Sequence, residues 1–171
     1  ALGYGLTLGV HSRVDEAIDG IVARARAGNV YVNRNIVGAV VGVQPFGGEG
    51  LSGTGPKAGG PLYLFRLLAG CPPDSAIEEL RALDPQGVSA ALRAYQPTLA
   101  AFESLRQWAR TAYPDLAVRC DRLAAFSPAG AKALLPGPTG ERNTYTALPR
   151  RAVLCIAGDA RDLLAQLALV L

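Results

Sequence analysis

Between residues 33 and 60 the chain reads Asn33-Arg-Asn-Ile-Val-Gly-Ala-Val-Val-Gly-Val-Gln-Pro-Phe-Gly-Gly-Glu-Gly-Leu-Ser-Gly-Thr-Gly-Pro-Lys-Ala-Gly-Gly60, with nine glycines in 28 residues. Glycine loses the most conformational freedom on folding, so this density indicates backbone that turns through positive φ or lies against another surface. Long loops inside compact domains are usually functional or disordered, and the apolar residues Val40, Val41 and Phe46 argue against disorder. We interpret residues 33–60, which we call the glycine loop, as a ligand-facing loop.

The segments before the glycine loop predict an α/β fold. Apolar residues recur every three or four positions between Ser12 and Gly28, which predicts a helix with one buried stripe. Ser12 and Asp15 form a capping pattern at its start. Residues 30–32 read as a short strand, and residues 5–10 are a candidate for a preceding strand. The stripe consists of Val14, Ala17, Ile18, Ile21, Val22 and Ala25.

The residues after the loop are predicted to change from a helical region to a second α/β unit. The apolar segment 62–68 is predicted as a strand, and residues 136–149 as a loop. Residues 152–157 resemble a buried strand, followed by a turn and helix cap at Gly158-Asp159. The predicted helices cover 75–83 (with Ser75 and Glu78 as a capping pair), 88–95, 99–112, 116–126, 128–134 and 160–171, and Pro97 interrupts the pattern.

Composition and charge exclude several classes of protein. Half of the 171 residues are hydrophobic and 18% are charged, which is enough to bury a core in one domain or in parts of two. The 15 arginines and two lysines lie scattered, whereas nucleic-acid binding calls for a basic stripe with interleaved aromatic residues. No apolar run approaches the roughly 18 residues of a membrane span, and the first residues lack the pattern of a signal peptide. The absence of methionine leads us to expect a piece of a longer protein.

Several candidate sites have simpler structural explanations. Gly48-Glu-Gly50-Leu-Ser-Gly53 matches a dinucleotide fingerprint formally, but neither the strand nor the helix that it needs is predicted beside it. His11 has no partner placed by spacing, and the three separated cysteines fit neither a zinc site nor a disulfide framework. Buried cysteines are ordinarily inert, and unpaired ones indicate a reducing, cytoplasmic setting. We therefore assign no catalytic, cofactor-binding or metal-binding residue. The helical face of Leu99, Phe102 and Trp108 is interpreted as packing.

The glycine loop carries the functional signal that remains. Gly38 and Ala39 are placed to present backbone N–H groups to an anion such as a carboxylate. Phe46, between Pro45 and Gly47, is placed to form the wall of an apolar pocket. A loop that only packs against a neighbouring domain explains the same composition equally well, so both interpretations stay open.

Three segments resemble the C-terminal end of the catalytic region of the aldehyde dehydrogenase superfamily. They are Tyr4-Gly-Leu-Thr-Leu-Gly-Val-His-Ser-Arg13, Ala27-Gly-Asn-Val-Tyr-Val-Asn33 and Gln44-Pro-Phe-Gly-Gly48 with Ser52-Gly53. The longer stretch from Val37 to Pro61 is similar to the proline utilisation A family of bacterial bifunctional proline-catabolic enzymes. Residues 74–171, with Gly137-Pro-Thr-Gly-Glu-Arg-Asn-Thr-Tyr145, resemble the longer members of that family, which carry an extra, non-catalytic domain similar to an aldehyde dehydrogenase fold.

The resemblance implies an FAD-dependent proline dehydrogenase upstream, feeding an NAD-dependent dehydrogenase for glutamate semialdehyde. By the same motif, the amides of Gly38 and Ala39 would bind the substrate carboxylate, and Phe46 would line its aliphatic part. The nucleophilic cysteine, general-base glutamate and NAD-binding fold of the family correspond to positions upstream of this chain. Aldehyde oxidation needs a thiolate, so the chain alone is expected to be inactive.

We therefore expect residues 1–70 to end an aldehyde dehydrogenase module, residues 74–135 to form a helical connector, and residues 136–171 to begin a Rossmann-like domain. The expected partners are the upstream domains of the same protein, with a homo-oligomer also possible. Two alternatives remain open: a segment of a different aldehyde dehydrogenase, and an interaction module in which residues 62–171 close a substrate tunnel or bridge protomers, with segment 62–68 pairing as an edge strand.

Overall fold

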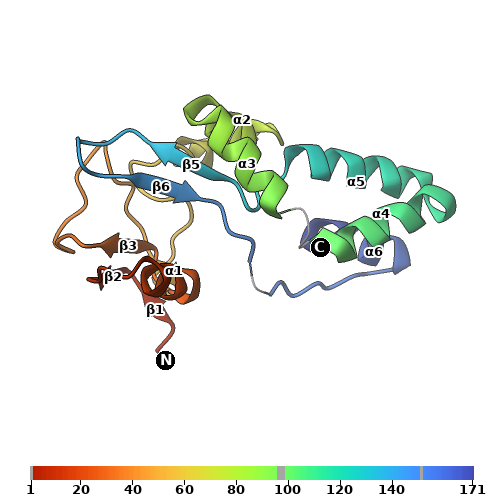
Figure 1. Cartoon of the computed structure of the whole chain (residues 1–171). Helices are drawn as coiled ribbons and strands as arrows, with labels where there is room; N and C mark the ends of the chain where they lie inside the picture. The colour runs from red at the N-terminus through yellow and green to blue at the C-terminus, as the bar shows by residue number, and fades with distance from the viewer. Residues whose placement is uncertain (1, 96–98, 151) are drawn as a thin grey trace. The chain divides into compact units, whose positions relative to one another are not determined.

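The computed structural model describes residues 2–95, 99–150 and 152–171. These residues form two compact units (Figure 1). Unit 1 consists of residues 1–71 together with 136–143, and unit 2 consists of residues 72–135 and 144–171. Each is a mixture of helices and two-stranded sheets, which confirms the α/β class at this coarse level.

Unit 1 is built on a β-α-β element. Strand β2 (Thr7–Val10) pairs in parallel with β3 (Asn29–Val32), and helix α1 (Asp15–Arg24) forms the crossover between them. Parallel neighbours need such a crossover. The order of strand, helix and strand that the sequence predicted for this part of the chain is confirmed. The shorter strands β1 (Tyr4–Gly5) and β4 (Glu49–Gly50) pair antiparallel, which ties the second half of the glycine loop to the start of the chain.

Helix α1 differs from the sequence prediction in two ways. Ser12 does not cap it, because the helix begins at Asp15 with Val14 as its N-cap residue. The backbone N–H and C=O of Ser12 exchange hydrogen bonds of 2.9 and 2.8 Å with the Asn33 side chain. Its hydroxyl instead accepts from the N–H of Val14 at 3.1 Å. The predicted buried stripe was also wrong, because no residue of α1 is buried: the described residues of the chain supply no surface that covers it.

Segment 62–68 is not the strand that we predicted. Residues Leu64–Leu67 form a 3-10 helix, η1, held by i→i+3 bonds such as that from the Arg66 N–H to the Tyr63 carbonyl. Leu64 and Leu67 are 70% and 72% exposed. An apolar run with no neighbouring strand to pair its backbone satisfies its hydrogen bonds locally, and here it does so by a tight helical turn.

Unit 2 contains two helix pairings. Helices α2 (Ser75–Leu83) and α3 (Pro85–Tyr95) pack on each other and on strand β5 (Lys132–Leu135), which pairs with β6 (Asn143–Thr146). Helix α4 (Ala100–Ala112) packs on α5 (Pro114–Phe126), and α5 packs on α6 (Ala160–Val170). The second group encloses a core of Phe102, Ala109, Leu116, Ala117, Cys120 and Ala168.

The side chain of Asp84 joins the first of these groups. One carboxylate oxygen accepts from the N–H of Gly87 in the first turn of α3, and the other accepts from the N–H of Leu134 in β5, both at 2.9 Å.

The helix predicted over 128–134 was wrong, since these residues pair with 143–147 instead. The predicted loop 136–149 likewise contains β6.

Two further predictions concern helix ends and the final strand. Asp159 caps α6 as expected, accepting from the Asp162 N–H at 2.7 Å, whereas Ser75 donates to the Pro72 carbonyl and does not cap α2. Residues 152–157 form no strand, so that prediction was wrong: no described strand lies beside them to complete the pairing that a buried strand needs. Pro97 lies outside the described residues.

Leu80 is fully buried between α2 and its neighbours, whereas Leu83, in the same helix, is 36% exposed. We expect Leu80→Ala to lower the free energy of unfolding by about 2–5 kcal/mol, because it removes buried methyl groups and leaves a cavity. Leu83→Ala, with the same chemical change, is the control and is expected to cost under about 1 kcal/mol. Urea unfolding of both variants measures the difference, and equal losses would contradict this account of the core.

Candidate functional site

The base of the glycine loop is held by two polar side chains, Asn29 and Lys57. The Asn29 side-chain amide donates to the Pro45 carbonyl at 2.8 Å and accepts from the Gly47 N–H at 3.2 Å. The Lys57 ammonium donates to the carbonyl of Gly28, to that of Gly47 at 2.9 Å and to the Asn29 side-chain oxygen at 3.4 Å. The start of β3 and the turn around Phe46 are thereby fastened together.

The turn around Phe46 lies directly on the residue before β3. A Cβ atom on Gly28 would stand 1.8 Å from the carbonyl oxygen of Gly47, so only glycine permits this approach. Phe46 and Ala58 exchange backbone hydrogen bonds of 3.0 and 2.9 Å, which closes the loop from the other side. The two ends of segment 46–58 are therefore held side by side, next to Gly28.

Burial of the Lys57 ammonium lowers its pKa, and the nearby Glu49 carboxylate raises it in part. Desolvation disfavours the charged form, whereas hydrogen bonds to three oxygens favour it. Burying this ammonium costs free energy unless its oxygen partners stay within hydrogen-bonding distance. The ammonium therefore favours the one backbone arrangement that keeps these oxygens together at the loop base.

The backbone around Gly38 and Ala39 offers two unoccupied donors. The Val37 N–H is taken by the Asn35 side-chain oxygen at 2.6 Å, and the Val40 N–H by the Gln44 side-chain oxygen at 3.0 Å. Between them, neither the Gly38 nor the Ala39 N–H donates a hydrogen bond to any described residue. Gly38 has a φ of +74°, a conformation that side chains disfavour. Adjacent free amides of this kind suit an anion.

The third predicted site residue, Phe46, lies on the same loop and is 37% exposed. A turn separates it from the free amides: the N–H groups of Val43 and Gln44 both donate to the Val40 carbonyl, at 3.1 and 2.9 Å. The structure thus places Gly38 and Ala39 before this turn and Phe46 after it. Phe46 has its backbone fixed by Ala58 and its ring available to solvent.

Sequence reasoning missed the polar side chains that hold this turn. Gln44 is only 7% exposed and donates from Nε2 to Glu141 Oε2 at 2.9 Å. The other oxygen of Glu141 accepts from Arg34 Nη1 at 3.1 Å, and the Arg34 guanidinium lies 5.0 Å from the centre of the Tyr31 ring. Glu141 is 97 residues from Gln44 and 107 from Arg34 in the chain, so no local spacing could signal the contact.

The other sequence candidates do not form a site. Gly48–Gly53 contains the two-residue strand β4 followed by a turn, in which the Gly53 N–H donates to the Gly50 carbonyl, and no helix opens there. His11 lines a shallow hollow of about 440 Å³ with Ser12, Arg13 and Asn33. Cys120 is buried, which raises the pKa of its thiol, and Cys71 is exposed. Among the described residues no three His, Cys, Asp or Glu side chains cluster as metal ligands.

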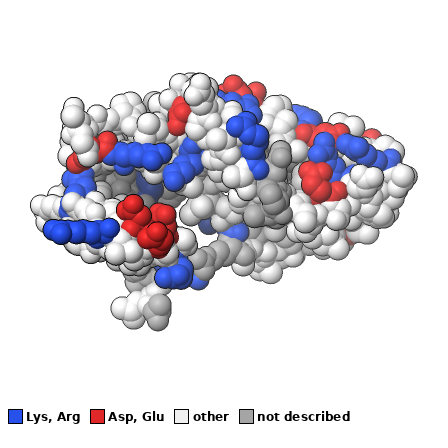
Figure 2. All heavy atoms as spheres, in the orientation of Figure 1, with Lys and Arg blue, Asp and Glu red and all other residues white. Residues whose placement is uncertain are grey.

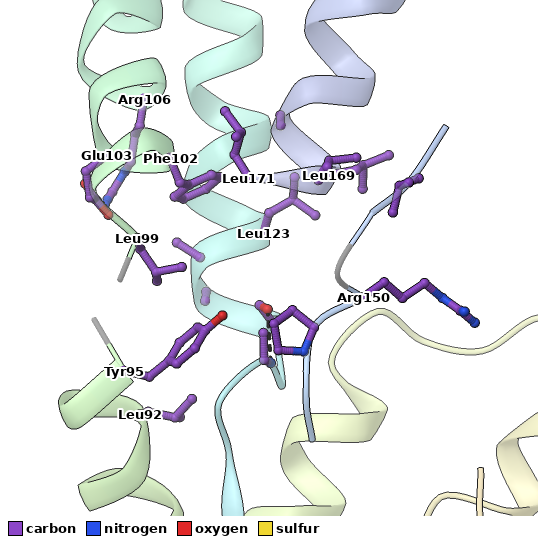
Figure 3. A pocket seen from close by; sticks show the side chains of 18 of the residues that line it. Leu92, Tyr95, Leu99, Phe102, Glu103, Arg106, Leu123, Arg150, Leu169 and Leu171 are labelled. Atoms are coloured by element: carbon purple, nitrogen blue, oxygen red, sulfur yellow. Dashed lines mark hydrogen bonds and ion pairs between the residues drawn. The ribbon is translucent and has the colours of Figure 1, made fainter. Parts of the chain in front are cut away.

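Unit 2 contains a cavity of about 540 Å³ with a mostly apolar lining (Figure 3). Leu99, Phe102 and Leu123 contribute to it and also pack on the helical core, in agreement with the packing role predicted for the first two. Trp108 is not buried there: its ring is partly exposed and lies tilted by 48° against that of Tyr113, with 5.2 Å between the ring centres. At the edge, the hydrogen bond to Asp121 raises the pKa of Arg106, which also pairs with Glu103.

Charged side chains of both signs lie on the face of the molecule that Figure 2 draws. On the face drawn in Figure 2, Lys and Arg side chains lie interspersed with Asp and Glu. Within the part of the chain that the structure describes, none of the helices has the length and apolar character that crossing a membrane requires.

Comparison with known proteins identifies the class of unit 1. Residues 1–68 match the aldehyde dehydrogenase family. The chain is also 51% identical over 62 residues to 1-pyrroline-5-carboxylate dehydrogenase of Geobacillus sp. (strain WCH70), covering 36% of this chain and 12% of that protein. The N-terminal part of the chain is therefore an aldehyde dehydrogenase region.

The whole chain matches a more particular group of proteins. It is 58% identical to the bifunctional protein PutA of Salmonella typhimurium (strain LT2) over 172 aligned residues, and 58% identical to that of Escherichia coli (strain K12) over 174. Each alignment covers 100% of this chain and 13% of the relative. The chain thus corresponds to a segment of the bifunctional PutA proteins and spans about 13% of their length.

The two lysines of the chain allow a matched test of the loop base, because Lys57 is half-buried and Lys132 is exposed. We expect Lys57→Met to lower the free energy of unfolding by about 1–3 kcal/mol, since it keeps the aliphatic stem but leaves the Gly28 and Gly47 carbonyls without their shared donor. Lys132→Met should change it by under about 0.5 kcal/mol. Denaturant titration measures both, and a neutral Lys57→Met would rule out the ammonium as the fastening group.

Proposed function

We propose that this chain supplies the aldehyde anchor of a dehydrogenase that oxidises glutamate semialdehyde, formed from 1-pyrroline-5-carboxylate, to glutamate with NAD. The single observation that carries the proposal is the pair of adjacent free N–H groups at Gly38 and Ala39, whose flanking N–H groups are already occupied. The similarity to bifunctional PutA proteins and to 1-pyrroline-5-carboxylate dehydrogenases supports the choice of substrate.

The anchor matches the two ends of such a substrate chemically. The amides of Gly38 and Ala39 bind its carboxylate, because adjacent backbone N–H groups that are free to donate favour an anion. Phe46 lines its methylene groups, since a partly exposed aromatic ring gains free energy by covering apolar surface. The anchored substrate then presents its aldehyde carbon to the nucleophile at a fixed distance from both contacts, which is how positioning lowers the barrier of the chemical step.

The covalent chemistry belongs to other parts of the longer protein. Oxidation of an aldehyde to an acid needs a thiolate nucleophile. Burial raises the pKa of the Cys120 thiol, which disfavours the thiolate form. The described residues also do not fit a dinucleotide, because the formal fingerprint at Gly48 opens no helix. NAD and the FAD of an upstream proline dehydrogenase module would bind outside this chain, and this chain alone is inactive.

The same proposal gives roles to the segments of the chain. Residues 1–70 end the aldehyde dehydrogenase module, residues 74–135 form a helical connector that ends in strand β5, and residues 136–171 begin a Rossmann-like domain in the cytoplasmic, PutA-like protein. Helix α6, capped by Asp159, supplies the helix that the last assignment expects, whereas residues 152–157 do not supply its strand.

An interaction role for residues 62–171 is a second candidate, favoured by the exposed leucines of η1. Leu64 and Leu67 project from a rigid helical turn, and Leu68 beside them is also exposed. Contiguous exposed apolar side chains mark interaction surfaces in soluble proteins. A second copy of the chain is the occupant that this candidate predicts, bridging protomers through η1.

Substitutions on the anchor test the first candidate in the longer protein that contains this chain. With glutamate semialdehyde, Gly38→Ala is expected to lower kcat/KM about tenfold, because a side chain at a φ of +74° costs roughly 1–2 kcal/mol and shifts both amides. Phe46→Ala should lower it by about 10- to 100-fold through lost apolar contact. With propanal, which has no carboxylate, Gly38→Ala should have no effect.

Gly59→Ala is the matched control for Gly38→Ala, since Gly59 has a φ of +69° and, like Gly38, open space around its α-carbon. NADH formation is the readout for all variants. Equal turnover of the two aldehydes, indifferent to Phe46, would overturn the anchor and leave a general aldehyde dehydrogenase.

The second candidate predicts that the chain forms a dimer in size-exclusion chromatography with light scattering. Leu64→Ser combined with Leu67→Ser should then shift the mass to that of a monomer, because both changes replace exposed apolar surface with polar surface. A well-behaved monomer of the unmodified chain at high concentration would count against self-association.

A further inference from the structure

We propose that Glu141 is a positioning residue for the substrate anchor: its two carboxylate oxygens fix the two flanks of the Gly38–Ala39 amide pair. The inference rests on the proposed function and adds to it a residue outside the glycine loop. It starts from the observation that the N–H groups of Val37 and Val40 donate to side chains, whereas those of Gly38 and Ala39 between them donate to no described residue.

The first flank is held through Gln44. A glutamine amide can present either its oxygen or its NH₂ to a given neighbour, and only hydrogen-bond partners decide between these orientations. The Glu141 carboxylate accepts and cannot donate, so the Gln44 NH₂ faces it at 2.9 Å. The Gln44 oxygen must then face the other way, where it accepts from the Val40 N–H at 3.0 Å. Glu141 thus determines that the oxygen of the Gln44 amide, and not its NH₂ group, faces the Val40 N–H.

Burial makes this orientation matter. Gln44 is the one polar side chain in the buried core of the described residues, with 7% of its surface exposed. Water cannot replace a mismatched partner at such a position at low cost. If the amide turned over, its NH₂ would face the Val40 N–H, and two donors would oppose each other. The backbone at residues 38–40 would then move or a donor would stay unpaired.

The second flank is held through Arg34. The other oxygen of Glu141 accepts from Arg34 Nη1 at 3.1 Å, and Arg34 Nε donates to the Asn35 carbonyl at 3.2 Å. The Asn35 side chain in turn accepts from the Val37 N–H at 2.6 Å. The guanidinium also lies over the Tyr31 ring of β3, 5.0 Å from its centre, which limits where Arg34 can point. One carboxylate therefore reaches both ends of the segment that carries the two free amides.

Glu141→Gln is the sharpest test because it keeps size and shape but leaves one acceptor oxygen where two are needed. In the longer protein we expect the KM for glutamate semialdehyde to rise about 5- to 20-fold, with kcat within twofold and the KM for propanal unchanged. Loss of binding to the carboxylate end alone produces this split. Glu16→Gln, the same change at an exposed carboxylate in α1, is the control and should match the unmodified enzyme.

Two further variants separate positioning from a general loss of structure. Glu141→Asp keeps both acceptor oxygens and should lie between the unmodified enzyme and Glu141→Gln; it carries the test if Glu141→Gln does not fold. A double-mutant cycle with Gln44→Ala should be non-additive, because Glu141 is proposed to act on one flank through Gln44. Additive effects, or equal rises in KM for both aldehydes, would overturn the inference.

Measuring Gly38→Ala and Phe46→Ala in the same assay distinguishes the two levels of proposal. If these variants discriminate between the aldehydes but Glu141→Gln and Glu141→Asp do not, the anchor stands and the role of Glu141 is wrong. If Gly38→Ala and Phe46→Ala show no discrimination, the anchor itself is wrong and the role of Glu141 falls with it.

Discussion

The Lys57 ammonium, held against the carbonyls of Gly28 and Gly47, is the interaction on which the geometry of unit 1 depends. A stretch with nine glycines has few side chains to pack, so apolar burial alone cannot select one conformation for it. A cation that needs several oxygens at once can do so, because it tolerates few arrangements of the backbone that supplies them. The contact between Gly28 and Gly47 brings those oxygens close enough.

Glu141 applies the same principle at the other end of the glycine loop. It places one negative group against Gln44 and Arg34, whereas Lys57 places one positive group against backbone carbonyls. The residues assigned to the substrate, Gly38, Ala39 and Phe46, belong to the same loop that these two charged groups hold. The loop can therefore keep its shape while the amides of Gly38 and Ala39 stay unpaired. The contacts of Lys57 and Glu141, which do not touch the substrate, offset the conformational entropy that the loop loses on folding.

The sequence predicted the features that depend on local pattern and missed those that depend on distant pairing. The periodicity of 12–28 and the β-rich segments around it gave the β2-α1-β3 unit, and helices such as α2 were predicted to the residue. Apolar runs were ambiguous: 62–68 became η1 and 128–134 contains part of β5, because the presence or absence of a partner strand decided each. The contacts of Lys57 and Glu141 span 29 and about 100 residues, so no spacing rule contains them.

The contrast between the two lysines also makes the chain chemically addressable. Amine-reactive reagents attack the neutral, accessible amine, and the Lys57 amine is engaged by three oxygens while Lys132 lies exposed at the start of β5. The ratio of acylation at the two positions therefore reports how often the loop base opens, with Lys132 as an internal reference. A molecule that orders the glycine loop would slow labelling at Lys57 alone, so a mass spectrum could follow occupancy without a catalytic assay.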